Sequence, residues 1–225
     1  METYWMRVCF STECPGVITH AFAISHYINL KKGNDEFSKK LLDFYFNGNN
    51  ADFFMQGLVD IYKLVFEKDK IRFDIITLIP GHESGSANQM MKLLAERFSA
   101  AVGIPYEQVL FRNRTVKQNH EINNVKGRYE NMKDSIDVTK NVKGKNIILM
   151  DNTIISGMSA VYITKILKER GAGNVVCLSL GFSDTEKEKD YWLDGKMLVS
   201  TLMSKFKGSK ISKSEREEYK KSKGV

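Results

Sequence analysis

The sequence predicts an α/β fold with a central parallel sheet flanked by helices. Two strand–helix–strand patterns support this class, one over residues 73–111 and one over residues 146–180. Consecutive units of this kind form parallel sheets with right-handed crossovers. We therefore expect about five parallel strands with helices on both faces, and ligands bound beyond the carboxyl ends of the strands.

The first unit begins with the β-branched run 73–79, which Pro80 and Gly81 close. Such a short apolar run is typical of a buried strand. The following helix ends at Gly103 and Pro105, and residues 109–111 are a second strand candidate. One face of that helix is apolar and comprises Met91, Leu94, Ala95, Phe98, Ala101 and Val102.

The second unit has a strand over 146–150, a loop that begins at Asp151, and a helix that stops at residues 171–173. The run 175–180 is the returning strand. Both loops that follow a leading strand, 80–87 and 151–159, are expected at the same edge of the sheet. This edge is therefore the predicted place for a ligand.

The N-terminal part is predicted to contain two amphipathic helices, because apolar residues recur at helical spacing over 37–45 and 50–66. Residues 47–50 form a turn between them, and residues 4–10 are a weaker strand candidate. The division of the chain that we expect is an N-terminal helical segment (1–70), an α/β core (71–204) and a basic C-terminal tail (205–225). Within the core, the polar stretch 112–141 is too long for a simple connection and predicts a flap or hairpin.

Composition excludes several classes of protein. The 225 residues are 42% hydrophobic and 27% charged with three prolines, which excludes a disordered chain. Without an apolar run of roughly 18 residues or a secretory signal, we expect a cytoplasmic protein with no membrane partner. Residues 205–225 hold eight Lys and Arg against three Glu, so much of the net charge of +7 belongs to the tail. Such a tail is usually solvated, and we expect no nucleic-acid partner.

Three cysteines cannot form a complete disulfide framework, and the series Cys9, Cys14, His20 and His26 lacks the tight paired spacing of structural zinc sites. No metal site is predicted there. We expect both histidines to be ordinary helix or surface residues.

The segment 147–159 carries the strongest chemical signal. Asp151 and Asn152 place a carboxylate and an amide at a strand end, where they can hold vicinal hydroxyls. Ser156, Gly157 and Ser159 open a helix, where backbone N–H groups and the helix dipole favour a phosphate. A plainer alternative is that Asp151 and Ser156 only cap the helix.

This string resembles the phosphoribosyl-pyrophosphate motif of type I phosphoribosyltransferases. The apolar strand 147–150, Asp151 and the Ser156–Gly157–Ser159 pattern match it, whereas Asn152 replaces the second acid and Ile155 a hydroxyl residue. The order of the segments 79–89, 112–118 and 128–131 is similar to the ComF-like branch of that family. The resemblance covers roughly residues 71–181.

The resemblance implies a type I phosphoribosyltransferase-like fold, an N-terminal hood over the site, and a role for each matched residue. Asp151 and Asn152 would meet the ribose 2- and 3-hydroxyls. The 5-phosphate would lie against Ile155, Ser156, Gly157, Met158 and Ser159. The pyrophosphate loop would be Gly81, His82, Glu83, Ser84 and Gly85.

The flap would supply the catalytic cations Arg112, Arg114 and Lys117, together with Gln118, Arg128 and Asn131. A solvated face is the alternative for each cation. Mg²⁺ would neutralise the departing pyrophosphate. Asp151 would interact with the Mg²⁺ ion only indirectly, through the metal-bound substrate.

The function implied is Mg²⁺-dependent transfer of a phosphoribosyl group to or from a nitrogenous base, in nucleotide metabolism or salvage. Phosphoribosyl pyrophosphate would be the other substrate or product. The alternative is a non-catalytic sensor or regulator that binds phosphoribosyl pyrophosphate or a nucleotide through the same fold. A homodimer is possible. The acceptor cannot be assigned, because it depends on contacts from the hood.

Overall fold

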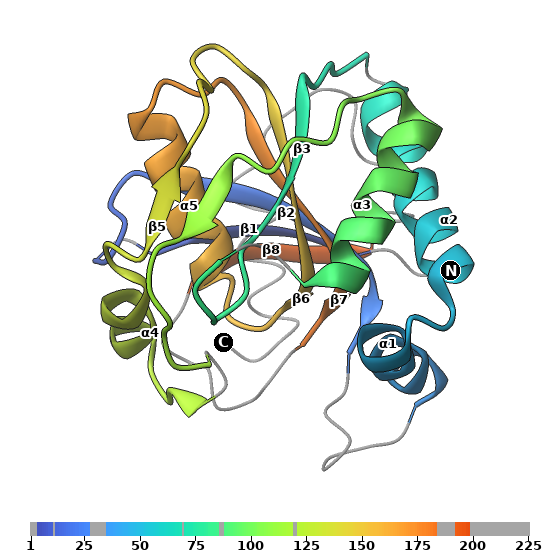
Figure 1. Cartoon of the computed structure of the whole chain (residues 1–225), viewed down its shortest axis with the longest axis horizontal. Helices are drawn as coiled ribbons and strands as arrows, with labels where there is room; N and C mark the ends of the chain where they lie inside the picture. Colours follow the sequence, from blue (N-terminus) through green and yellow to red (C-terminus); the bar gives the residue numbers. More distant parts are fainter. Residues whose placement is uncertain are drawn as a thin grey trace.

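A six-stranded sheet forms the centre of the described structure, a computed structural model (Figure 1). The structure describes residues 4–10, 12–27, 35–68, 70–85, 88–118 and 121–183, and the backbone of 192–198. The strands lie in the order β3-β6-β7-β2-β1-β8. Their bounds are β1 (Tyr4–Cys9), β2 (Ile18–His26), β3 (Ile75–Leu78), β6 (Ile147–Ile154), β7 (Val175–Phe182) and β8 (Trp192–Leu198).

The sheet is mostly parallel. Strands β3, β6, β7 and β2 run in one direction, while β1 is antiparallel to both β2 and β8. The predicted fold class is confirmed. The expectation of about five parallel strands was too simple, since the chain before residue 27 adds two strands to the sheet.

These first two strands belong to the predicted N-terminal helical segment, of which only residues 4–10 were expected as a strand. The weak strand candidate over residues 4–10 is present as β1. Strand β2 was not predicted. It carries His20, which is exposed as expected of a surface residue, and the half-buried His26. Its buried positions include the small residues Ala21 and Ala23, so it lacks the long branched run that marks the other inner strands.

Helices cover both faces of the sheet (Figure 1). Helices α1 (Glu36–Asn47), α2 (Ala51–Ile61) and α3 (Gln89–Val102) lie on one face, with the π-helical turn η1 (Tyr62–Glu67). Helix α5 (Met158–Glu169) lies on the other face. Alternate residues of β6 enter the two cores: Ile147 and Leu149 pack on the α5 side, and Ile148 and Met150 on the α1–α3 side. The helices predicted from periodicity are therefore confirmed.

Residues 112–141 have structure of their own, as expected of so long a stretch. Strands β4 (Leu110–Arg112) and β5 (Ile136–Val138) form an antiparallel pair, and helix α4 (Val125–Met132) lies between them in sequence. The prediction that 109–111 returns to the main sheet was wrong. The chain pairs with β3 only around Tyr106, through hydrogen bonds of Ile76 with Pro105 and Glu107, and then leaves to form β4.

Strand β6 is longer than predicted. The loop was expected to begin at Asp151, but β6 continues to Ile154 and pairs with β7 through Asp151–Ser179 and Thr153–Gly181. This extension holds the backbone of Asp151 and Asn152 within the sheet. Both residues still lie in the last half of the strand, at the carboxyl edge.

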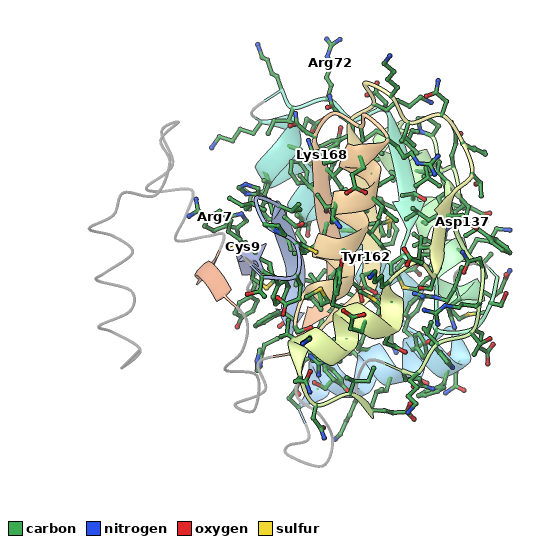
Figure 2. The ribbon with its side chains drawn as sticks, turned by 90° about the vertical axis from the view of Figure 1, so that its left-hand side faces the viewer. Arg7, Cys9, Arg72, Asp137, Tyr162 and Lys168 are labelled. Atoms are coloured by element: carbon green, nitrogen blue, oxygen red, sulfur yellow. The ribbon has the colours of Figure 1, made fainter. Side chains whose placement is uncertain are left out.

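The opposite edge of the sheet is distinct from the site described below. Arg72, before β3, and Lys168, in the last turn of α5, lie at the same end of the molecule (Figure 2), which is the amino end of the parallel strands. No helix within the described ranges is both long and apolar enough to cross a membrane. The predicted basic tail, 205–225, lies outside the described residues.

Candidate functional site at the carboxyl edge of the sheet

A cleft of about 380 Å³ opens where β2, β3 and β6 end. Several segments of the chain meet in it, among them the loop after β3, the end of β6 with the start of α5, residues 116–118 of the flap, and helix α1. The sequence-predicted residues that line it are Gly81, His82, Arg112, Lys117, Gln118, Asp151, Asn152, Ile155, Ser156, Gly157, Met158 and Ser159. The edge predicted to hold a ligand is therefore hollow.

Asp151 and Asn152 lie half-buried at the end of β6. The Asp151 carboxylate accepts the Asn152 N–H at 2.8 Å, and the Asn152 side-chain oxygen accepts the Thr153 N–H at 2.7 Å. Burial raises the pKa of the Asp151 carboxyl to about 7, although hydrogen bonds from the Asn152 and Thr153 backbones act in the opposite direction. A cation or a pair of hydroxyl donors at this carboxylate would favour its ionised form.

The turn from β6 into α5 is compact. Gly157 has φ of 81°, and a Cβ atom on it would lie 2.8 Å from Val8 Cγ1, so both conformation and space favour glycine. The buried Ser156 hydroxyl accepts the Met158 N–H at 3.3 Å. Ser156 thus accepts an N–H from the first turn of α5, whose N-cap residue is Gly157, whereas Asp151 makes no such bond in the hydrogen bonds described here.

The predicted pyrophosphate loop is only partly exposed to the cleft. Gly81 and His82 line it, whereas Glu83, Ser84 and Gly85 do not. The loop pairs instead with the end of β4 and the chain after it. The Val116 N–H donates to the His82 carbonyl at 2.8 Å, and the backbones of Gly85 and Arg112 exchange two hydrogen bonds of 2.9 Å.

Arg112 differs from the expected mobile flap cation. Its side chain is 3% exposed and donates to the carbonyls of Gly81 and Pro80 and, at 2.6 Å, to the Ser135 hydroxyl. Burial, and next the charge of Arg114, lower the pKa of its guanidinium to about 10. With its donors directed at protein oxygens, Arg112 holds the loop after β3 in place.

The other flap residues divide into two groups. Lys117 and Gln118 line the cleft, and the Gln118 side chain lies 3.3 Å from His82 Nε2. Arg114, Arg128 and Asn131 do not line it. Arg114 donates to two backbone carbonyls, buried Arg128 donates to the Ile122 carbonyl, and Asn131 bonds both the N–H and the carbonyl of Lys117.

One side of the cleft comes from the N-terminal segment that was expected as a hood, although none of its residues was named as a site residue. Its residues come from helix α1 and the end of β2, and we call them the aromatic wall: Tyr27, Leu41, Leu42, Tyr45 and Phe46. The available signal was the run Phe44-Tyr45-Phe46. Three consecutive aromatic side chains point 100° apart around a helix and cannot all face one core.

The described residues contain no cluster of three or more His, Cys, Asp or Glu placed to hold a metal. Neither Cys9 nor Cys14 is part of a disulfide bond. In the cleft, Asp151 supplies one carboxylate and Asn152 one amide. This donor set fits a Mg²⁺ ion that arrives on a polyphosphate, which provides most of its oxygen ligands.

Comparison with known proteins found relatives that are similar to part of this chain. No protein-family model matches the chain. The amidophosphoribosyltransferase of Staphylococcus aureus (strain MRSA252) is 26% identical over 114 residues, which are 50% of this chain and 22% of that protein. Human amidophosphoribosyltransferase is 35% identical over 79 residues, or 35% of this chain and 15% of the relative.

The resemblance to type I phosphoribosyltransferases is thus confirmed. The chain spans less than a quarter of the length of these curated relatives, and no comparison tests the ComF-like branch, which stays a prediction. Solved structures with a related arrangement include a glutamine phosphoribosylpyrophosphate amidotransferase from B. subtilis complexed with ADP and GMP. It is 19% identical, covers 62% of this chain and 30% of its own, and has a TM-score of 0.40.

A hypoxanthine-guanine phosphoribosyltransferase from Bacillus anthracis also has a TM-score of 0.40. It is 13% identical over 62% of this chain and 71% of its own.

Proposed function

We propose that this chain transfers a phosphoribosyl group between phosphoribosyl pyrophosphate and a nitrogenous base. The observation that carries the proposal is the meeting of three segments in one cleft: the loop after β3, the end of β6, and the start of α5. In the resemblance, these segments serve pyrophosphate, ribose and 5-phosphate respectively. The similarity to phosphoribosyltransferases supports transfer of this kind.

In this proposal the chain mainly positions and neutralises its substrate. The backbone of 155–159 and the Ser156 and Ser159 hydroxyls would receive the 5-phosphate at the amino end of α5. Asp151 and Asn152 would accept and donate hydrogen bonds at the ribose hydroxyls. Gly81 and His82 would face the pyrophosphate, with Lys117 as the cation that lines the same cleft.

Mg²⁺ would bring charge neutralisation to the leaving pyrophosphate. Asp151 is the carboxylate that would interact with it, through the substrate rather than as one of several protein ligands. Burial raises the pKa of Asp151 to about 7. A bound cation and the ribose hydroxyls would both act against this shift and favour the charged form of the carboxyl group.

Binding of phosphoribosyl pyrophosphate with Mg²⁺, measured by calorimetry, tests the site. We expect Asp151→Ala to weaken binding by at least about 10-fold, which corresponds to about 1.4 kcal/mol. The matched control is Asp60→Ala, which removes an exposed carboxylate on α2, outside the cleft. Equal binding by wild type and Asp151→Ala, or no binding by wild type, contradicts the proposal.

A non-catalytic sensor of phosphoribosyl pyrophosphate or a nucleotide is the second candidate, because Asn152 stands where the family has a second acid. The substitution removes one negative charge beside a site for a cation, and the Asn152 side-chain oxygen already accepts the Thr153 N–H. Pyrophosphate release with a panel of bases separates the candidates. Tight binding without release on any base favours the sensor.

A further inference from the structure

The amino edge of the sheet, at the other end of the strands from the cleft, gathers cations from three turns of the chain. The residues before β3 (70–74), before β6 (143–146) and before β7 (168–174) meet there, because these three strands run parallel. Five of their six cations are exposed, and the sixth, Lys145, is half-buried. We call these six side chains the basic edge: Lys70, Arg72, Lys143, Lys145, Lys168 and Arg170.

Asn146 holds the three turns together. Its side-chain amide donates to the Arg72 carbonyl at 3.1 Å, and its side-chain oxygen accepts the Asn174 N–H at 2.8 Å. Its backbone N–H donates to the Asp74 carboxylate at 2.7 Å. Two backbone hydrogen bonds of 2.8 Å also join the turn before β6 to the turn before β7. The backbone that carries the cations is therefore fixed.

The cations of the basic edge have no carboxylate partner among the described residues. Elsewhere exposed cations do pair, as Arg97 does with Asp52. The two acids of the three turns are already engaged, since Asp74 accepts a backbone N–H from the neighbouring turn and the Glu169 carboxylate lies 3.7 Å from Lys165 Nζ. Six cations against two carboxylates give the edge a net charge of +4, which favours an anionic partner.

Two exposed apolar side chains lie at the same edge. Ile18 begins β2, which runs parallel to β7, and is 51% exposed. Ile71 precedes Arg72 and is 39% exposed, and its N–H donates to the Phe66 carbonyl at 2.9 Å. Phe73, the one aromatic residue of the three turns, is buried. The edge thus offers cations and aliphatic surface but no exposed ring from these turns.

We propose that the basic edge binds an acidic segment of a partner protein, whose apolar side chains cover Ile18 and Ile71. Single-stranded nucleic acids bind through bases stacked on aromatic rings, and the three turns expose none. A duplex would contact the cations through its phosphates and leave the isoleucines in water. Protein interfaces instead combine apolar contact with a polar rim. The inference does not depend on the proposed function, since the cleft opens at the carboxyl edge of the sheet.

Fluorescence anisotropy of the full chain with a labelled peptide in which Glu and Leu alternate tests this surface. In an extended peptide the two residue types lie on opposite sides, so Glu can meet the cations while Leu meets the isoleucines. The basic-edge variant is Arg72→Glu, Lys143→Glu, Arg170→Glu. These three exposed side chains make no hydrogen bond to a described residue, and Figure 2 shows Arg72 pointing away from the protein. We expect the Kd of the variant for the peptide to rise at least about 10-fold at low salt.

The matched control is Lys39→Glu, Lys92→Glu, Lys126→Glu. It reverses as many exposed charges, on α1, α3 and α4, and should change the Kd by less than about twofold. A further variant, Ile18→Ser with Ile71→Ser, tests the apolar contact. It should weaken binding of the Glu–Leu peptide about fivefold and leave binding of a Glu–Ser peptide unchanged.

Several outcomes would overturn the inference. Equal weakening by the basic-edge variant and its control would show a general effect of net charge, and binding that persists in the basic-edge variant would lie elsewhere, for instance on the basic tail. A DNA duplex that binds more tightly than the Glu–Leu peptide, and loses its affinity in the basic-edge variant, would identify a nucleic-acid surface instead. Absence of peptide binding, or an isoleucine variant that binds like wild type, would rule out the proposed partner.

Discussion

The turn after β6 and the loop after β3 meet in one cleft, but different interactions hold them. The turn is fixed by the central core, since Ser156, Gly157 and Met158 are buried and Gly157 packs on Val8 of β1. The loop is fixed by hydrogen bonds to β4 and the chain after it, outside the main sheet. One side of the site therefore depends on packing and the other on polar contacts between distant segments.

The two sides should therefore tolerate different kinds of substitution. Packing against a dense core leaves little room for added atoms. A layer of hydrogen bonds is instead sensitive to the removal of a donor, because the acceptors that remain buried lose their partners. The predictions below test the two sides separately.

Gly157→Ala should have the largest effect, because it adds a methyl group 2.8 Å from Val8 and imposes a left-handed backbone on alanine. We expect a loss of about 3 kcal/mol in the free energy of unfolding, measured with urea. Gly103→Ala is the control, because φ there is +70° but nothing lies within 4 Å of the added carbon. It should cost about 1 kcal/mol. Similar losses in the two variants would show that the turn is not limited by packing.

Arg112→Gln tests the hydrogen-bonded side. The variant loses a charged donor to Gly81, Pro80 and Ser135, and we expect about 2 kcal/mol of destabilisation in the same urea measurement. Arg112→Lys should not restore stability, since an ammonium group cannot reproduce the guanidinium fork. Arg114→Gln, at an exposed position, should change the free energy of unfolding by less than about 0.5 kcal/mol. Equal changes in the free energy of unfolding for Arg112→Gln and Arg114→Gln would indicate that Arg112 does not hold the loop and acts as a flap cation.

Asp151→Asn tests the cost of holding a carboxyl in the cleft. Its pKa is raised from 3.8 to about 7 in the folded chain, so the folded state binds the proton more tightly than the unfolded state. The stability that this group contributes is fully present below pH 4 and is lost as the pH rises to 7.

Relative to Asp151→Asn, wild type should therefore lose stability progressively between pH 4 and pH 8, measured by urea unfolding at several pH values. The comparison variant, Asp60→Asn, removes an exposed carboxyl of α2. A difference between wild type and Asp151→Asn that does not vary with pH would contradict the raised pKa.

The turn after β6 could be predicted from sequence because local signals agree there. The apolar run 147–150, the polar pair that follows it and Gly157 all lie within eleven residues, and together they specify strand, turn and helix start. Only the length of β6 was wrong. Its last residues, 151–154, include polar side chains and continue the strand because β7 offers a parallel partner.

The loop after β3 and its flap could not be predicted in the same way. The sequence around Arg112 is polar and predicts an exposed cation. Its burial depends on Gly81, which lies 31 positions earlier, and on Ser135, which lies 23 positions later. Local patterns carry no information about such contacts.

Strand β2 and the aromatic wall were missed for two further reasons. The small buried residues of β2 do not resemble the branched runs of other inner strands. For α1, the predicted apolar face was Phe37, Leu41, Leu42 and Tyr45. In the structure Phe44 also enters the core, and Phe46 remains exposed. Burial in a helix is decided by the angle at which it packs, which its own sequence does not contain.

Asn131 offers the mildest test of the hydrogen-bonded side. Its side chain accepts the Lys117 N–H at 3.1 Å and donates to the Lys117 carbonyl at 2.9 Å, which ties α4 to the flap residue that lines the cleft. Asn131→Asp keeps the acceptor but replaces the donor, so we expect the free energy of unfolding to fall by only about 0.5 kcal/mol.

The local effect of Asn131→Asp should be larger than the global one. Amide hydrogen exchange at Val116 and Lys117 should accelerate about 10-fold, because the flap would open without unfolding the sheet. Exchange at Leu149 and Met150, in the buried part of β6, serves as the internal control and should stay unchanged. If both pairs of amides accelerated together, the flap would open only when the whole domain unfolds, and the two sides of the cleft would share one stability after all.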